Sequence, residues 1–284
     1  MKKLISIAKI INSFSVLHYV YSIIKNGRLD YNYRYREQGM LKNIVILTGA
    51  GISAESGIPV FRSETGLWEN HNVDDVATPE GYERDPDLVR NFYNTLRSNL
   101  KKVEPNPAHK ALAKLEENWK NGTVTVITQN IDDLHERAGS KNILHMHGEL
   151  LKQSCYVLHG GCGDVFEIHT DQKPTDCCPH CGKMGTLRPH IVWFGEMPLY
   201  MDEIAQILSE GDLFISIGTS GVVYPAAGFV STAHRYNIPT VEFNLEPSAT
   251  KGFFDYGIYG KAGTTLPKFV DRLLECNGDL NQLF

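Results

Sequence analysis

The amino-acid sequence predicts an α/β fold: a Rossmann-like, mainly parallel sheet with helices on both faces, accompanied by a small domain that two insertions form. Three observations predict it. Short β-branched apolar runs alternate with helical patterns along most of the chain, as in parallel sheets. The first run, at 43–48, leads into Gly-Ala-Gly, which is typical of a buried strand that feeds a tight turn. Two stretches, 66–104 and 151–187, interrupt the alternation.

The expected elements follow the hydrophobic pattern in chain order. We expect strands at 43–48, 123–128, 143–146, 191–194, 212–217 and 240–243. We expect helices between several of them, such as 108–119 and 201–210. The Rossmann-like domain then comprises 42–65, 105–150 and 188–276. The remaining parts are a helical insertion at 66–104, a cysteine-rich insertion at 151–187 and a C-terminal tail at 277–284.

Composition narrows the class of protein. Hydrophobic residues make up 42% of the 284 residues and charged residues 21%, which excludes collagen, coiled coil and wholesale disorder. The net charge of −5 disfavours direct nucleic-acid binding, because proteins that bind phosphates usually carry a basic surplus. Six cysteines are too few for a disulfide scaffold of this length.

Residues 1–41 form an N-terminal extension that we expect to be disordered or dispensable, with Met40 as the working start. The apolar stretch 1–24 is interrupted by polar residues and falls short of the roughly 18–20 apolar residues of a membrane span. An amphipathic surface helix and a targeting segment remain alternatives. We expect no stable membrane insertion and a cytoplasmic location.

The first chemical signal is the glycine motif Gly49-Ala-Gly-Ile-Ser-Ala-Glu-Ser-Gly57, directly after a predicted strand. Glycines there let the backbone turn sharply and approach a pyrophosphate, which the amides of the next helix then bind. The alternative is a strand–turn–helix junction with small residues for close packing. A dehydrogenase would also need an acidic residue about 20 positions further on, at the end of the second strand. The next predicted strand starts far later, which argues against hydride transfer.

Polar residues also end two other predicted strands. In Thr128-Gln-Asn-Ile-Asp132, the amide and the carboxylate could bind ribose hydroxyls or a carboxamide, or one of them could simply cap the following helix. In His145-Met-His-Gly148, a histidine could act as a general base, although a lone histidine is more often structural. The spacing puts both histidines on one face of a strand, so only geometry can separate their roles.

The cysteines of the second insertion predict a metal site. Cys178-Pro-His-Cys181 is a clear half-site for tetrahedral zinc, and we expect Cys155 and Cys162 to complete it. With four protein ligands the zinc would be structural, since catalysis needs an open position. Two alternatives remain open: a substitute ligand, or reduced cysteines without metal. The possible substitute ligands are Cys177, His159 and His180.

Together these motifs resemble those of the sirtuins, the NAD-dependent protein-lysine deacylases. The resemblance runs from about residue 42 to residue 275 and includes Gly57-Ile-Pro-Val-Phe-Arg62, His147-Gly148-Glu149, Val192-Trp-Phe-Gly-Glu196, Gly218-Thr-Ser220 and Asn244-Leu-Glu246. The bacterial class III enzymes of the CobB type are most similar. The shared motifs are Gly66-Leu-Trp-Glu, Val76-Ala-Thr-Pro-Glu80 and Phe92-Tyr-Asn94.

The resemblance implies NAD and Zn²⁺ as cofactors and assigns residues to each part of NAD. The pyrophosphate would lie along Gly49, Ala50, Gly51 and Glu55, under a closing loop that contains Phe61 and Arg62. The nicotinamide ribose and carboxamide would be held in the segment Gln129, Asn130, Ile131 and Asp132. The adenosine half would be held by Gly218, Thr219, Ser220, Asn244, Leu245, Glu246 and Ala262.

The resemblance also implies a reaction. His147 would be the base that takes a proton from a ribose hydroxyl, with Asn130 and Asp132 as further catalytic residues. The products would be free lysine, nicotinamide and O-acyl-ADP-ribose. The acylated lysine of a protein would bind through its backbone, as an added strand. The residues that would pair with it are Val192, Phe194, Gly195 and Glu196.

One departure from the family bears on the acyl group. Class III enzymes that remove acidic acyl groups carry Tyr-x-x-Arg, whose guanidinium meets the distal carboxylate of succinyl- or malonyl-lysine. Here Tyr93 is followed by Leu96 at that position, and the arginine falls at Arg97. On a helix Tyr93 and Arg97 share a face, so Arg97 could still reach the pocket. Ala77 suggests a roomy pocket. We expect deacetylation, with desuccinylation or demalonylation as a further activity.

Two other functions remain open. A protein ADP-ribosyltransferase would use the same NAD site but pass the ribose to a protein acceptor. A non-enzymatic reader would use the cysteine insertion to bind nucleic acid or protein.

Overall fold

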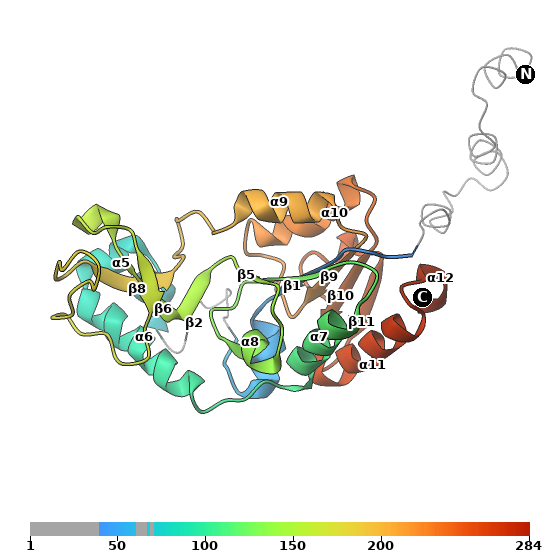
Figure 1. The fold of residues 1–284 in the computed structure, drawn as a ribbon, viewed down its shortest axis with the longest axis horizontal. Helices are drawn as coiled ribbons and strands as arrows, with labels where there is room; N and C mark the ends of the chain where they lie inside the picture. The colour runs from blue at the N-terminus through green and yellow to red at the C-terminus, as the bar shows by residue number, and fades with distance from the viewer. Residues whose placement is uncertain (1–39, 61–66, 69–70) are drawn as a thin grey trace, which may run out of the picture. The chain divides into compact units, whose positions relative to one another are not determined.

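The computed structural model describes residues 40–60, 67–68 and 71–284 (Figure 1). Within the described residues, no helix has the length and apolar character needed to cross a membrane.

A six-stranded parallel sheet forms the centre of residues 40–284, in the order β11-β10-β9-β1-β4-β5. Its strands are β1 (Ile44–Thr48), β4 (Val124–Thr128), β5 (Ile143–His145), β9 (Leu213–Ile217), β10 (Thr240–Asn244) and β11 (Tyr256–Tyr259). Every residue of β1, β4 and β9 is buried, which explains why apolar residues do not simply alternate with charged ones in these strands. The predicted α/β class is therefore confirmed.

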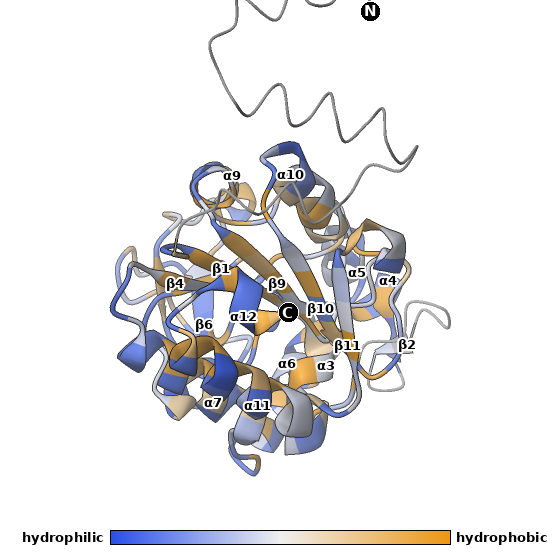
Figure 2. Ribbon diagram, turned by 90° about the vertical axis from the view of Figure 1, so that its right-hand side faces the viewer, coloured by the Kyte–Doolittle hydropathy of each residue, from blue (hydrophilic) through white to orange (hydrophobic). Residues whose placement is uncertain are grey.

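Helices cover both faces of the sheet (Figures 1 and 2). On one face, α7 (Pro107–Asn118) and α11 (Ala262–Glu275) pack their apolar residues against strand residues such as Ile46 and Ile215. On the other face, α9 (Met201–Ser209) and α10 (Phe229–Arg235) pack against residues such as Val45 and Phe214. The orange strands in Figure 2 lie between these two pairs of helices. The sheet is thus buried on both sides and leaves only its edges and strand ends for chemistry.

The two insertions form one small domain with its own core. The first supplies α4 (Val73–Val76), α5 (Pro79–Arg84) and α6 (Pro86–Leu100). These helices pack against an antiparallel sheet in the order β7-β6-β8. Its strands are β6 (Gly148–Cys155), β7 (Val165–Glu167) and β8 (Leu187–Ile191). Only Met146 and His147 separate β5 from β6, so the chain passes directly from the parallel sheet into the small antiparallel sheet.

The remaining elements are short. They are α3 (Ala50–Ser53), η2 (Ala54–Ser56), β2 (Leu67–Trp68), β3 (His71–Asn72), α8 (Leu134–Ala138), η3 (Val157–His159), η4 (Ala226–Gly228), η5 (Lys251–Phe253) and α12 (Leu280–Leu283). The last of these occupies the predicted C-terminal tail.

Two strand predictions need correction. The strand expected at 191–194 is wrong: the strand is Leu187–Ile191, and it pairs antiparallel with β6 instead of joining the parallel sheet. Trp193 is buried because it packs in the core of the small domain, and burial alone makes a loop look like a strand. The sequence also missed β11, in which Gly257 interrupts the apolar run between Tyr256 and Ile258.

Candidate active site

The predicted site residues gather at the carboxyl edge of the parallel sheet. The chain leaves β1 toward β4 and β5 on one side, and it later adds β9, β10 and β11 on the other side. The strand order therefore reverses between β1 and β9, and ligands of open α/β sheets bind at such a point. The segments after β1, β4, β9 and β10 are those in which the sequence placed its dinucleotide-binding residues.

At this reversal, two glycine turns lie in direct backbone contact. The Gly49 amide donates to the carbonyl of Ile217 at 3.0 Å, and the Gly51 amide donates to the carbonyl of Gly218 at 2.9 Å. A Cβ added to Gly51 would lie 2.7 Å from the Cα of Gly218, and Gly218 itself has a φ of +63°. The close-packing interpretation of these glycines is therefore realised in the structure. It also keeps side chains out of the crevice, as a bound pyrophosphate would require.

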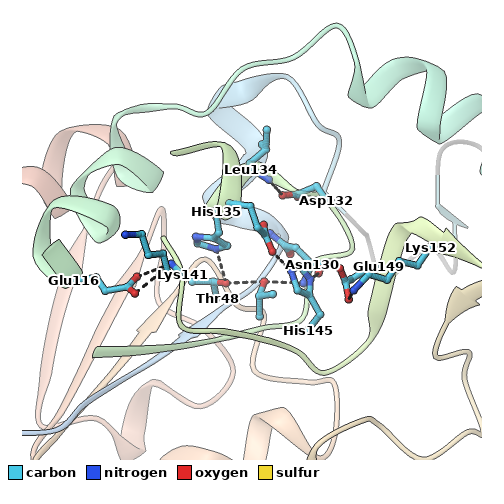
Figure 3. A network of polar contacts seen from close by, with 12 residues as sticks. Thr48, Glu116, Asn130, Asp132, Leu134, His135, Lys141, His145, Glu149 and Lys152 are labelled. Carbon is cyan, nitrogen blue, oxygen red and sulfur yellow. Dashed lines mark hydrogen bonds and ion pairs between the residues drawn. The ribbon is translucent and has the colours of Figure 1, made fainter. Parts of the chain in front are cut away.

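The loop after β4 is held by buried polar contacts, and Figure 3 labels two of its residues, Asn130 and Asp132. The Ser53 hydroxyl donates to Asp132 Oδ2 at 2.9 Å, and the Asn130 amide donates to Ser53 Oγ at 3.1 Å and to the Gly49 carbonyl at 3.2 Å. Asp132 also accepts from the backbone amide of Leu134, the first residue of α8, at 3.1 Å, although the N-cap residue of α8 is Asp133. Burial raises the pKa of Asp132 above its ordinary value, although these hydrogen bonds oppose that rise.

Sequence reasoning missed the residues beneath these contacts. Thr48 Oγ1 donates to Thr128 Oγ1 at 2.8 Å and lies 3.1 Å from His135 Nε2. Thr128 Oγ1 also accepts a hydrogen bond from the backbone amide of Asn130 at 3.0 Å. Burial lowers the pKa of His135 well below its ordinary value. The available signal was a threonine at the last position of two buried strands, β1 and β4, whose pairing places Thr48 beside Thr128.

The two histidines at the end of β5 have different partners. His147 Nδ1 lies 3.1 Å from the carbonyl oxygen of Gln129, and a carbonyl only accepts, so Nδ1 carries the proton. In a neutral ring this leaves Nε2 as the basic nitrogen. Burial lowers the pKa of His147, although its hydrogen bond to Gln129 opposes that shift. His145 instead lies between the Asn130 carbonyl and Glu136. The geometry thus separates two histidines that the sequence could not.

The residues assigned to the adenosine half lie around β9 and β10. Gln129 and Thr219 line one pocket together with Ser216, Gly221 and Thr250. The side-chain amide of Asn244 donates to the Thr219 carbonyl at 2.7 Å, which connects the end of β10 to the loop after β9.

Other predicted NAD residues are also placed. Glu55 accepts the amide of Gly263 at 2.8 Å, so it lies beside the start of α11, where Ala262 stands. Ala50 opens α3, and the Ile131 carbonyl accepts the Leu150 amide at 2.8 Å. Leu245 and Glu246 are exposed after β10, and the Ser220 carbonyl accepts the Ala249 amide. Phe61 and Arg62 lie outside the described residues.

The four predicted zinc ligands come together in the small domain. The sulfur atoms of Cys155, Cys162, Cys178 and Cys181 all lie within 4.8 Å of one another. Two of the pairs, 155 with 181 and 162 with 178, are 3.7 Å apart. Four sulfurs at about 2.3 Å from a tetrahedral zinc are about 3.8 Å apart, so the residues fit this metal. The substitutes have other partners: His159 contacts Glu83, and His180 contacts Asp164.

The guanidinium of Arg97 is hydrogen-bonded within the protein and is not directed at a ligand carboxylate. It is 3% exposed, and its guanidinium donates to the Leu150 carbonyl at 3.2 Å and to Asn94 Oδ1. Burial lowers its pKa to about 10, although the charge of Asp171 opposes the shift. Arg97 therefore ties α6 to β6. Leu96, one position earlier, packs against the apolar core of the small domain.

Tyr93 and Ala77 line the same core as Leu96. Tyr93 is fully buried, and its hydroxyl accepts from Trp193 Nε1 at 3.0 Å. Burial raises the pKa of Tyr93 far above its ordinary value, so the hydroxyl stays neutral. Ala77 is 4% exposed, and its carbonyl accepts the Phe194 amide at 2.9 Å. Among the described residues, Leu96, Tyr93 and Ala77 thus belong to one apolar cluster.

The segment predicted to bind the substrate backbone is a loop. The Val192 amide donates to the His147 carbonyl at 2.9 Å, so the segment lies next to the histidine. Glu196 is engaged internally, because its carboxylate accepts from Arg188 at 2.7 Å and from the Trp193 amide at 2.9 Å. Gly195 has a φ of +91°, and Phe194 is 47% exposed. The backbone amides of Val192 and Phe194 are therefore already used within the protein, by the carbonyls of His147 and Ala77.

Comparisons with known proteins agree with this arrangement. A model of the Sir2 family matches residues 49–225. The chain is 58% identical over 236 residues to the NAD-dependent protein deacylase SIR2rp3 of Leishmania major, covering 82% of this chain and 96% of the relative. It is 57% identical over 235 residues to an NAD-dependent protein deacylase of Vibrio vulnificus, covering 82% and 94%. A crystal structure of a Sir2 homologue in complex with NAD aligns with a TM-score of 0.75 at 36% identity, covering 88% and 96%.

Proposed function

The chain belongs to the Sir2 family, and from this premise we propose that it is an NAD-dependent protein deacylase acting on acylated lysine side chains. Relatives that share nearly their whole length with it carry that name. One observation of the site carries the proposal most directly. His147 keeps a basic Nε2 at the strand end where the Asn130–Asp132 loop meets the glycine turn.

The chemistry divides between NAD and the protein. When bound, NAD would supply the ribose carbon that bonds to the acyl oxygen as nicotinamide leaves. One water would be consumed when the acyl group is released from the lysine nitrogen, so the products would be free lysine, nicotinamide and O-acyl-ADP-ribose. His147 Nε2 takes up the proton of a ribose hydroxyl, because its Nδ1 proton is held by the Gln129 carbonyl. Asn130 and Asp132 orient groups near the leaving nicotinamide. The zinc stays outside the reaction, since four cysteines leave it no open position.

The deacylase activity is favoured over protein ADP-ribosylation, because the named relatives are deacylases. The test uses His147→Ala and an acetyl-lysine peptide with NAD, followed by mass spectrometry. We expect the wild-type protein to remove the acetyl group and His147→Ala to lose turnover while its melting temperature and NAD binding persist. An added ADP-ribose mass on the peptide, or full activity in His147→Ala, would contradict the proposal.

We further infer that the acyl group is neutral. Leu96 stands where an arginine would meet an acidic acyl group, and the guanidinium of Arg97 is occupied by Leu150 and Asn94. The nearby Tyr93 hydroxyl is neutral and Ala77 is small. A succinyl carboxylate brought among Leu96, Tyr93 and Ala77 would meet no cationic partner from these three residues, and burying an unpaired charge costs several kcal/mol. A panel of acetyl-, propionyl-, malonyl- and succinyl-lysine peptides tests this, and we expect turnover of the first two only.

We also propose that the protein works in the cytoplasm. The zinc site needs four reduced cysteines, and cytoplasmic thiols are kept reduced. Cell fractionation with an antibody to the protein tests this location.

A further inference from the structure

His145 has no role in the reaction described above, yet it is one of the most constrained side chains near the site. It is 6% exposed. Its Nδ1 lies 3.1 Å from the carbonyl oxygen of Asn130, and its Nε2 lies 2.6 Å from Glu136 Oε1 of α8. Figure 3 shows His145 next to Asn130. The imidazole thus bridges α8 and the loop that carries the proposed catalytic residues.

The protons of this bridge can be counted. A backbone carbonyl oxygen only accepts hydrogen bonds, so Nδ1 must donate. An ionised carboxylate also only accepts, so Nε2 must donate as well. A neutral imidazole has one N–H, whereas the imidazolium has two. Both contacts are therefore satisfied together only by the charged ring.

The carboxylate does not supply the missing proton. The Glu136 side chain is 42% exposed, and its hydrogen bond to His145 and the ring's charge lower its pKa, although burial opposes this. Glu136 is therefore ionised while the ring is charged.

We propose that His145 is a charged positioning residue, which as an imidazolium ties Glu136 to the Asn130 carbonyl and so holds the Asn130–Asp132 loop in place. His147, two positions further along the chain, donates the single N–H of a neutral ring to the carbonyl of Gln129, the residue before Asn130. Two consecutive carbonyls are thus held by two histidines in different charge states. The consequence for turnover rests on the proposed function, whereas the charge state of the ring does not.

The charges around His145 favour the imidazolium. Burial alone would lower its pKa, but the hydrogen bond and charge of Glu136, the charge of Glu149 on β6 and the Asn130 carbonyl outweigh it, and the pKa is raised. The carboxylate of Asp132, in the loop after β4, also interacts with the ring, whose positive charge stabilises it. On α8, His135 also interacts with His145, but it is neutral because burial lowers its own pKa. Lys152 on β6 acts on Glu136.

Loss of the proton breaks the bridge in a definite way. Because the pKa is raised in the folded protein, the bridge is intact at lower pH and is lost as the pH rises through that pKa. The remaining proton then stays on Nε2, where the Glu136 carboxylate binds it more strongly than a neutral carbonyl does. The unprotonated Nδ1 then faces the Asn130 carbonyl oxygen with a lone pair. Two acceptors repel each other, so the hydrogen bond that holds the loop is lost.

The charge state is measured directly by nitrogen NMR of the imidazole rings, with His145→Gln to assign the signals. An unperturbed histidine, with a pKa of about 6.5, is mostly neutral at pH 7. We expect two ring protons on His145 at that pH and one on His147. A single ring proton on His145 at pH 7 would overturn the inference. This measurement needs no turnover, so it stands apart from the test of the deacylase activity.

The consequence for the site is tested with Glu136→Gln. The new amide can donate to Nε2, so a neutral His145 keeps both contacts with its proton on Nδ1. In the wild-type protein we expect kcat/KM for NAD to fall about tenfold for each pH unit above the pKa of His145. In Glu136→Gln we expect less than a twofold change over the same range, with one ring proton on His145. An identical alkaline decrease in both proteins would refute the positioning role.

Glu83→Gln is the matched control. Glu83 contacts His159 with the same 2.6 Å separation between Nε2 and Oε1, but this pair lies in the small domain and touches none of the proposed catalytic residues. We expect Glu83→Gln to keep the wild-type pH profile. Loss of the alkaline decrease in this variant as well would show that the effect does not come from His145.

Discussion

At the scale of single residues, the acceptors around a side chain decide what that side chain can do. His147 faces one carbonyl and keeps a basic nitrogen, whereas His145 faces a carbonyl and a carboxylate. Arg97 shows the same principle, since two internal acceptors hold its guanidinium. In each case the residue type was visible in the sequence, but its partner was not.

The first prediction concerns the acid side of the pH profile. His147 acts as a base only when Nε2 is unprotonated, and burial lowers its pKa below the ordinary value of 6.5. Activity should therefore be full at neutral pH and fall as the pH decreases through that lowered pKa. The measurement is kcat against pH with an acetyl-lysine peptide. Half-maximal activity reached only above pH 6.5 would contradict the assignment.

The second prediction concerns Leu96→Arg. A guanidinium at this position would meet the distal carboxylate of succinyl-lysine, and a charge-assisted contact of about 2 kcal/mol corresponds to about 30-fold in rate. We expect kcat/KM for the succinyl peptide to rise by about that factor, with little gain for the acetyl peptide. Steady-state kinetics on both peptides measures the ratio. Equal gains on the two peptides would remove the carboxylate argument.

Arg97→Met is its matched control, one position along α6. Arg97 holds Leu150 and Asn94, so its loss should lower the free energy of unfolding by about 1–3 kcal/mol. The ratio of succinyl to acetyl turnover should stay unchanged. Denaturant unfolding and the same kinetics test both outcomes, and a fall in the ratio would show that Arg97 reaches the acyl group.

At the scale of elements, the zinc cluster stabilises a sheet that is too small to be stable alone. Away from the helices, the end of this sheet near the cysteines has a small apolar cluster around Cys155, Cys178 and Leu187. Strands of this kind need further support, and a structural zinc supplies it. Since β6 starts at Gly148 and β8 ends at Ile191, the same sheet fixes the chain on either side of the proposed active site.

The third prediction follows from this dependence. Cys178→Ser should abolish zinc binding, lower the melting temperature by more than about 5 °C and remove activity, because a structural zinc contributes on the order of 10 kcal/mol. Cys177→Ser is the control, since Cys177 is adjacent and exposed but lies outside the cluster. It should keep zinc and activity. Metal analysis and thermal unfolding distinguish the two, and equal effects would mean that the ligand set is wrong.

At the scale of the whole molecule, the described unit has its own cores. Among the described residues, the clusters on the two faces of the sheet and the one in the small domain draw on residues from Leu41 to Leu283. A unit with its own hydrophobic core can fold alone.

The fourth prediction is that a chain beginning at Met40 folds and works. We expect its melting temperature to lie within about 3 °C of the full chain, because a 1 kcal/mol change shifts a protein of this size by roughly 2–4 °C. We expect its kcat/KM to lie within twofold. A chain that aggregates, or that loses activity while folded, would assign residues 1–39 a role.

Local patterns in the sequence determined the fold class and the zinc cluster. The buried strands are rich in apolar and β-branched residues at successive positions, as burial on both faces of a parallel sheet favours. The four cysteines could be chosen because few residue types bind zinc. The NAD-binding and base residues came from ordered motifs, and the structure brings most of them to one edge of the sheet.

Tertiary structure alone decided the roles that depend on distant partners. Asn130 meets Ser53 across 77 positions, and Arg97 meets Leu150 across 53. The pairing of β8 with β6 likewise follows from packing in the small domain, not from the apolar run that the sequence shows. Hydrogen-bond partners set both the charge of a histidine and the direction of a guanidinium, and no local pattern encodes which acceptor a fold will place there.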